Sequence, residues 1–222
     1  NKNYVSFSGD IRDKSKLLEA FNDIEIVFHL AFINGTEFFY NKPELVLDVG
    51  IKGMINVIDC IKEKNIKELY LASSSEVYQT PLKIPTSENE IMKIPDPYNP
   101  RYSYGAGKII SEILSINYCR EILDKLIIFR PHNVYGPNMG KEHVIPELII
   151  KAINAKKNKE RKLLIQGDGK QTRSFNYIDD FCNGILLLLN DAKGFNTYNI
   201  GSKNEIQIKD LTEMIIKKLN YN

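Results

Sequence analysis

The chain has 222 residues, of which 43% are hydrophobic and 26% are charged, enough for one sizeable core or two small ones. Its 30 Lys and Arg residues nearly balance 28 Asp and Glu residues, leaving a formal net charge of +2. This balance gives no electrostatic reason to expect nucleic acid or an anionic membrane as a partner. The longest aliphatic run, 185–189, is far too short to span a bilayer, so a cytoplasmic protein is expected.

The first half of the chain alternates short apolar runs with helical patterns. Strands are predicted at 4–7, 26–31, 69–72 and 126–129, and helices at 14–22, 46–64 and 106–123. Continuous apolar strands separated by helices are typical of a parallel sheet with helices on both faces. We therefore predict an α/β fold built on such a sheet, which binds ligands at the carboxyl ends of its strands.

The second half is less regular. A proline-rich loop, 81–101, leads into the third helix and would form the rim of a site. Further helices are predicted near 146–155, near 180–190 and from 209, strands at 162–166 and 196–200, and a Gly-rich turn at 167–169. We predict a first domain over 1–137 and a smaller α/β lobe over 138–222. The N-terminal βαβ unit and the end of the lobe are expected to be missing.

The three cysteines, Cys60, Cys119 and Cys182, lie far apart and form no C-x-x-C pair. Each falls within a hydrophobic pattern, which predicts three small core residues in a reducing compartment. The three histidines show no metal-ligand spacing, so no metal site is predicted.

The sharpest combination of reactive residues is Tyr104 and Lys108, four residues apart on one helical face, with three serines, 73–75, ending a strand upstream. A tyrosine has an unperturbed pKa of about 10, and a nearby ammonium group lowers it. A serine hydroxyl at this strand end could hold the substrate oxygen whose proton moves. The set predicts removal of a proton from an alcohol while a hydride leaves the same carbon. For Tyr104 and Lys108 alone, an exposed helical pair is the alternative.

Other polar residues follow predicted strands. Asp10 could accept a hydrogen bond from an adenine amino group, whereas Asp13 is expected to cap the next helix. Pro131 stops a central strand, and Asn133 beyond it can donate to a ligand oxygen. Arg173 follows the Gly-rich turn and suits a diphosphate, which arginine can bind in bidentate fashion. An ion pair with a carboxylate is the alternative for Arg173.

Six ordered segments carry a family resemblance: 9–13 (GDIRD), 27–31 (VFHLA), 73–78 (SSSEVY), 104–108 (YGAGK), 130–137 (RPHNVYGP) and 171–175 (QTRSF). Together they cover nearly the whole chain. The chain resembles the extended short-chain dehydrogenase/reductase family, which comprises NAD-dependent nucleotide-sugar epimerases, dehydratases and decarboxylases.

The resemblance implies a Rossmann-like fold, with a partial dinucleotide-binding domain over 1–137 and a substrate-binding lobe over 138–222. It also implies an enzyme that keeps NAD bound, acts on a UDP-sugar and forms a homodimer. It makes Tyr104 the base, Lys108 the ligand of the nicotinamide ribose, Ser74 the residue that orients the sugar hydroxyl and Glu76 a second acid or base. Tyr104 and Lys108 thus also contact the cofactor. The other cofactor contacts that the resemblance implies are Asp10, Ile11, Leu30, Ala31 and Pro131. Besides Ser74, the substrate contacts that it implies are Asn133, His143, Val144 and Arg173.

Three features depart from the family pattern. The Gly-x-x-Gly-x-x-Gly turn, which places a pyrophosphate at a helix N-terminus, does not occur in the 222 residues. Whether this chain by itself binds NAD is therefore left open. Gly50 stands where the family usually carries Asn, so a structural or water-holding contact is expected to be lost. His143 stands where epimerases often place an amide, so the phosphate contact is expected to differ.

The pair Ser75-Glu76 bears on the reaction. Deoxythymidine-type 4,6-dehydratases usually carry Asp-Glu at this point, whereas Ser-Glu resembles UDP-glucuronate decarboxylases and many epimerases of cell-surface sugar pathways. We expect a UDP-hexose 4-epimerase that works through a 4-keto sugar, with decarboxylase and dehydratase as alternatives. Alternatives of another kind are a non-catalytic dinucleotide-binding module and an inactive fragment. The complete set of Ser74, Tyr104 and Lys108 disfavours the module.

Overall fold

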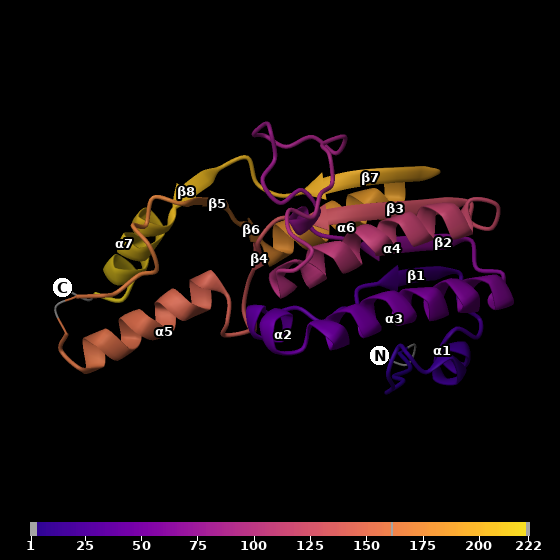
Figure 1. Ribbon diagram of the computed structural model, residues 1–222, viewed down its shortest axis with the longest axis horizontal. Helices are drawn as coiled ribbons and strands as arrows, with labels where there is room; N and C mark the ends of the chain where they lie inside the picture. Colours follow the sequence, from indigo (N-terminus) through magenta and orange to yellow (C-terminus); the bar gives the residue numbers. More distant parts are fainter. Residues whose placement is uncertain (1–3, 161, 221–222) are drawn as a thin grey trace. The chain divides into compact units, whose positions relative to one another are not determined.

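The computed structural model describes residues 4–160 and 162–220 (Figure 1). The chain forms two compact units. The first unit holds the residues up to Pro131 together with Leu187–Asn199, and the second holds His132–Leu186 and the residues from Ile200 onward. The chain therefore leaves the first unit after Pro131 and returns to it within a helix.

The first unit is built on a four-stranded sheet in the order β1-β2-β3-β7. Its strands are β1 (Ile26–His29), β2 (Glu68–Ala72), β3 (Lys125–Pro131) and β7 (Phe195–Ile200). β1, β2 and β3 run parallel, with Leu69 of β2 level with Val27 and Leu126 on either side. Successive residues 69–71 of β2 are at most 1% exposed, because both faces of the sheet are covered. The predicted parallel sheet is confirmed.

Two long helices, α3 (Pro43–Lys64) and α4 (Ser103–Cys119), pack against each other on one side of this sheet (Figure 1). The core that they share with the strands includes Val27, Leu69, Leu71, Leu126, Ile128, Met54, Val57, Ile58, Ile61 and Cys119. Toward the other face, the Tyr70 hydroxyl donates to the Leu189 carbonyl of α6 (Ile178–Asp191) at 3.4 Å. The Rossmann-like arrangement predicted from the sequence is therefore present.

Short helices connect these elements: α1 (Lys14–Ala20), α2 (Thr36–Asn41), η1 (Ser75–Val77) and η2 (Pro100–Tyr102). Asp13 caps α1 as predicted, because its Oδ1 accepts from the backbone N–H of Ser15 at 3.1 Å and of Lys16 at 3.3 Å. Asn65 ends α3 in the left-handed conformation, with φ of 53°.

The second unit contains α5 (Val144–Lys157) and α7 (Ile208–Lys218), which pack on each other. Its strands are β4 (Val134–Tyr135), β5 (Thr172–Ser174), β6 (Asn176–Tyr177) and β8 (Glu205–Gln207). β4 pairs in parallel with β6, and β5 pairs antiparallel with β8. The predicted Gly-rich turn is present, and Gly167 and Gly169 both have φ of +73°, a conformation that favours glycine.

Three predicted elements differ in the structure. Residues 4–7 form no strand: Tyr4 and Val5 are 76% and 73% exposed, and they pair with no strand of the described residues. Residues 162–166 alternate in burial as a strand would, but they too lie outside every ladder in the described chain. An apolar pattern alone does not make a strand, because the strand's backbone groups need a neighbour to bond to. The strand expected in the smaller lobe at 196–200 is β7, which joins the main sheet.

Cys60 and Cys119 are buried as predicted, but Cys182 is exposed on α6. The prediction for Cys182 was wrong because an amphipathic helix turns some positions of an apolar run, at intervals of three to four residues, toward its outer face. No helix among the described residues is long and apolar enough to cross a membrane.

Candidate active site

Two serines follow β2 at its carboxyl end and point to different partners. The backbone N–H of Ser73 donates to the Phe129 carbonyl at 2.8 Å, and its hydroxyl donates to Glu112 of α4. Ser74 caps η1, with its Oγ accepting from the Glu76 N–H at 3.2 Å. Both serines are buried. Of the two serines, Ser74 is the one whose hydroxyl acts on Tyr104, where it favours the phenolate.

Tyr104 and Lys108 lie on the first two turns of α4 and face the end of β2. Lys108 is 4% exposed, and its Nζ donates to the Ala72 carbonyl at 2.6 Å. Tyr104 is half-buried, and the Ser74 side chain lies near enough to affect its pKa. The structure thus brings Ser74, Tyr104 and Lys108 together at one strand end, as their spacing predicted.

The pKa values of this pair differ from the expectation. Burial raises the pKa of Tyr104, the Ser74 hydrogen bond opposes the rise, and the charge of Glu76 adds to it. Burial lowers the pKa of Lys108 to about 7, against the opposing effect of Glu112. The expected lowering of the Tyr104 pKa by Lys108 is therefore wrong for the chain by itself, because burial of the phenol prevails. At neutral pH Tyr104 is protonated and able to donate to a substrate oxygen.

Glu76, the predicted second acid or base, lies on η1. Its carboxylate is about half exposed and lies 3.9 Å from the guanidinium of Arg101. η1 can approach α4 closely because residue 105 is glycine: a Cβ there would lie 3.2 Å from the Glu76 carbonyl oxygen. The backbone of Glu76 is therefore held next to Tyr104, while its carboxylate reaches solvent.

A buried ion pair supports the strand end. Arg130 of β3 and Glu112 of α4 are 4% and 1% exposed, and they pair at 2.6 Å. Arg130 also donates to the Tyr78 hydroxyl at 2.6 Å and to the Glu88 carbonyl at 3.0 Å. One guanidinium thus links β3, α4 and the proline-rich loop. This pair was not predicted, and the sequence gives one signal for it: an acid one helical turn after Lys108, on the same face.

Two aromatic side chains, Phe32 and Phe39, contact Tyr104, and neither was predicted as a site residue. The Phe39 ring stacks on Tyr104 at a centroid distance of 5.2 Å, and the Phe32 ring meets it edge-on at the same distance. The face of Phe32 also receives the Lys108 Nζ, 4.2 Å from the ring centroid. The available signal was the aromatic enrichment of residues 32–40 directly after a strand end.

The residues expected at the cofactor's adenine end have partners of their own. Arg12 pairs with Asp10 at 2.6 Å and with Asp48 of α3 at 2.7 Å. The hydrogen bonds from Arg12 lower the pKa of Asp10 to about 2, so its carboxylate is ionised and bonded within its loop. The side chain of Ile11 packs against Gly53, where any Cβ would overlap it.

In the second unit, two predicted substrate residues line one pocket of about 140 Å³. They are Val144, at the start of α5, and Arg173, on β5. His143 is the N-cap residue of α5 and does not line this pocket. Asn133 lies apart from it, and its Nδ2 donates to the Ser174 carbonyl at 2.9 Å. The amide of Asn133 therefore holds the backbone of β5.

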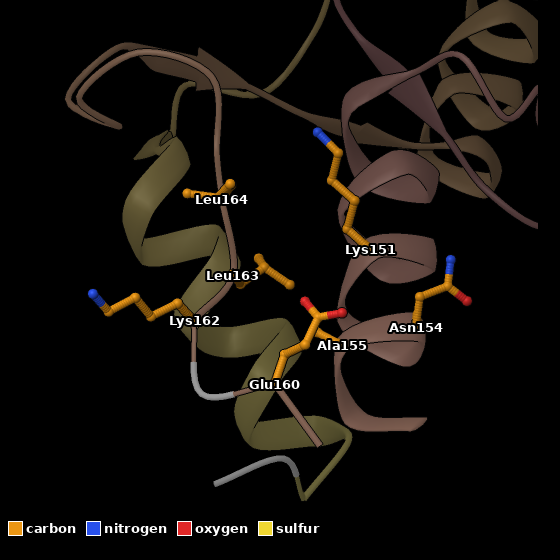
Figure 2. A pocket seen from close by; sticks show the side chains of 7 residues that line it. All are labelled: Lys151, Asn154, Ala155, Glu160, Lys162, Leu163 and Leu164. Atoms are coloured by element: carbon orange, nitrogen blue, oxygen red, sulfur yellow. The ribbon is translucent and has the colours of Figure 1, made fainter. Parts of the chain in front are cut away.

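A larger hollow of about 680 Å³ lies between α5 and the segment that follows it (Figure 2). Its lining residues are Lys151, Asn154, Ala155, Glu160, Lys162, Leu163 and Leu164. None of the predicted site residues is among them, so this hollow is separate from the predicted site.

Residues 3–201 match the sequence model of the NAD dependent epimerase/dehydratase family, and the chain belongs to this family. The family's cofactor is NAD. The dTDP-D-glucose 4,6-dehydratase of Dictyostelium discoideum is 31% identical over 225 residues, which cover 96% of this chain and 50% of that protein. The UDP-N-acetyl-alpha-D-glucosaminuronate decarboxylase of Bacillus cytotoxicus is 31% identical, with 92% and 62% covered.

A putative UDP-glucose 4-epimerase of Methanocaldococcus jannaschii is 31% identical over 232 residues, which cover 100% of this chain and 72% of that protein. Among solved structures, the UDP-N-acetylglucosamine 4-epimerase of Methanobrevibacter ruminantium has a TM-score of 0.80 and 27% identity, with 96% of this chain and 66% of that chain covered. The UDP-glucose 4-epimerase of Thermotoga maritima, at 24% identity, shares the fold with a TM-score of 0.84 over 100% of this chain and 70% of its own. The chain thus spans about half to three quarters of the proteins it matches.

The first unit offers groups that suit the nicotinamide end of NAD. The exposed Leu30 and Ala31 follow β1 at the carboxyl edge of the sheet, and the half-buried Pro131 ends β3. His29 is buried, and its Nε2 has no hydrogen-bond partner among the described residues. Lys108 uses one of its three N–H donors on β2. These residues fit a ligand with a polar ribose and an apolar ring.

Proposed function

We propose that Ser74, Tyr104 and Lys108 form the catalytic part of an NAD-dependent enzyme. This enzyme acts on a nucleoside-diphosphate sugar and is a UDP-hexose 4-epimerase. The observation that supports this most is the convergence of Ser74, Tyr104 and Lys108 at the carboxyl end of β2. A module that merely bound a dinucleotide would have no use for a serine, a tyrosine and a lysine gathered at one strand end.

In this proposal NAD, when bound, would supply the acceptor for a hydride from the sugar and the donor that returns it to the opposite face of the 4-keto sugar. The Ser74 hydroxyl orients the 4-hydroxyl of the sugar, and Tyr104 takes its proton and gives it back. Because the Tyr104 pKa is raised in the chain alone, Tyr104 needs nearby positive charge to act as a base. Lys108 orients the cofactor ribose and, once protonated, supplies such a charge. Leu30, Ala31 and Pro131 contribute apolar surface beside the cofactor, and Asp10 and Ile11 contact its adenine.

The substrate's nucleotide would bind in the second unit. Val144 and Arg173 share a pocket, and a guanidinium suits a diphosphate. We assign His143 and Asn133 to the same ligand; Asn133 would act chiefly by holding β5, to whose backbone it is bonded.

Decarboxylation of a UDP-uronate is the second candidate. Ser75-Glu76 favours it over dehydration, and a decarboxylase is among the relatives at 31% identity. Glu76 would then act near the ring as an acid or base from the rim of the site.

The test uses the protein expressed from its complete gene, purified and assayed for bound NAD, then incubated with UDP-glucose, UDP-glucuronate and dTDP-glucose. UDP-galactose from UDP-glucose is the expected product. Carbon dioxide from UDP-glucuronate alone would replace the epimerase assignment with decarboxylase. A 4-keto-6-deoxy product from dTDP-glucose alone would replace it with dehydratase. A protein that binds NAD and converts none of the three sugars would contradict the enzyme assignment.

A further inference from the structure

The ring of Phe32 occupies a slot that only glycine permits. Phe32 lies in the loop after β1, and its ring enters between Gly50 of α3 and Gly107 of α4. A Cβ on Gly107 would lie 2.8 Å from the Phe32 Cζ, and a Cβ on Gly50 would overlap the ring. Glycine within a helix is unfavourable, so two glycines facing one ring need a reason in the packing.

This arrangement also explains why glycine stands at position 50, where the family usually carries Asn. Gly50 was expected to remove a structural or water-holding contact. In the structure the place beside Gly50 is filled by Phe32, so a ring replaces the contact that a larger residue 50 would make.

The same ring contacts both reactive side chains of α4. Its face lies 4.2 Å from the Lys108 Nζ, within cation–π distance, and it meets the Tyr104 ring at 84°. Gly107 lies between these two residues in the sequence, so the slot and the reactive pair belong to one helical segment.

We infer that Phe32, wedged between Gly50 and Gly107, is a positioning residue that holds the Lys108 ammonium and the Tyr104 ring for the reaction. This inference rests on the proposed function for its effect on turnover. Its structural part, the hold on Lys108, can be tested without any substrate.

The variant Phe32→Leu removes the ring and keeps an apolar side chain. Phe38→Leu is the matched control, because Phe38 is 41% exposed on the neighbouring α2. The charged and titratable groups around Lys108 are Glu112 on its own helix, His29 on β1 and Tyr104. None of these is changed by either variant.

The first measurement is the titration of the Lys108 amine by NMR in the purified, lysine-labelled protein, with its signal identified through Lys108→Met. Loss of the ring removes an interaction that favours the cation, and leucine keeps the place apolar, so Phe32→Leu should lower the pKa of Lys108 by roughly half a unit or more. Phe38→Leu should leave it unchanged. An unshifted pKa in Phe32→Leu, or a pKa raised because water enters, would overturn the inference, even if the protein proves inactive on every sugar tested.

The second measurement is turnover with the substrate identified above. Phe32→Leu should lower kcat about tenfold or more, with KM for the sugar nucleotide within about twofold of wild type. Gly107→Ala should lower kcat in the same way by displacing the ring, and should have little further effect in the Phe32→Leu background. Wild-type kcat in Phe32→Leu, despite a shifted Lys108 titration, would overturn the positioning role while leaving the proposed function intact.

Discussion

At the scale of single residues, burial sets the chemistry of Tyr104 and Lys108. Both charged forms are disfavoured: the pKa of the phenol is raised, and the pKa of the amine is lowered to about 7. A bound ligand that brings charge or displaces water at this strand end would alter both values. The unliganded pair is therefore poised to respond to the ligand that it is proposed to bind.

The buried amine predicts a pH-dependent stability difference. Above pH 10.5 Lys108 is neutral in both the folded and the unfolded state. As the pH falls toward 7, only the unfolded chain takes up the proton, so the wild type loses stability; below pH 7 both states are protonated and the loss is constant. Lys108→Met should therefore be more stable than wild type by on the order of 4 kcal/mol at pH 7, and by much less at pH 10. Urea unfolding at a series of pH values measures the difference, and a gap independent of pH would contradict it.

Tyr104→Phe should remove turnover while leaving the packing intact, because the ring that Phe32 and Phe39 contact is retained. Loss of a general acid or base typically lowers the rate by about 10²–10⁴-fold. Steady-state kinetics and thermal unfolding of the purified variant test this. The control is Tyr98→Phe, since Tyr98 is 94% exposed. Activity within a factor of two of wild type in Tyr104→Phe would exclude Tyr104 as the base.

At the scale of elements, the Arg130–Glu112 pair connects β3, α4 and the proline-rich loop. Removal of one partner leaves the other charge buried without compensation, which typically costs about 3–5 kcal/mol. Glu112→Gln should therefore lower the free energy of unfolding by about 3 kcal/mol. Glu147→Gln is the control: Glu147 pairs with Lys151 on the exposed face of α5, and its loss should change stability by less than about 1 kcal/mol.

The outcome is read from denaturant unfolding of both variants. Equal stabilities would show that the buried pair contributes no more than a surface pair. A double variant, Glu112→Leu with Arg130→Met, should regain part of the loss because no isolated charge remains.

Elements whose residues follow a clear hydrophobic pattern could be predicted from the sequence. β2 is buried on both faces and therefore has a continuous apolar run. α3 has apolar residues that recur at helical spacing along most of its 22 residues. β4, β5, β6 and β8 were missed, since strands of two or three residues leave no periodicity to read. The strands wrongly expected at 4–7 and 162–166 have the apolar pattern of a strand but have no neighbouring strand to pair with in the described chain.

The candidate site could be predicted only where its residues are close in sequence or at strand ends. Tyr104 and Lys108 share a helical face, and Ser74 ends a strand, so their convergence follows from local geometry. The contacts of Arg130 with Glu112 and of Phe32 with Gly50 and Gly107 join distant segments. The spacing of residues in the sequence does not predict such contacts, because they depend on how α3, α4 and the sheet pack.

At the scale of the whole molecule, the proposed reactive residues and the proposed diphosphate-binding residues belong to different units. The reactive set lies in the first unit, and the pocket of Val144 and Arg173 lies in the second. Substitutions in the two units should therefore have separable kinetic effects.

Arg173→Ala should weaken binding of UDP by about tenfold, because a charged hydrogen bond to phosphate is lost. The titration of Lys108 should not change. Calorimetry with UDP measures the affinity, with Lys203→Ala as a control at an exposed lysine of the same unit. Unchanged affinity in Arg173→Ala would remove Arg173 from the proposed diphosphate site.

The place of β7 in the sheet bears on how the protein is made. β7 pairs next to β3, yet 63 residues separate the end of β3 at Pro131 from the start of β7 at Phe195. During synthesis the ribosome releases β1, β2 and β3 well before their last partner emerges. Until then the outer side of β3 presents unpaired backbone groups that can pair with another nascent chain. Translation speed between β3 and β7 should thus influence how much of the newly made protein stays out of aggregates.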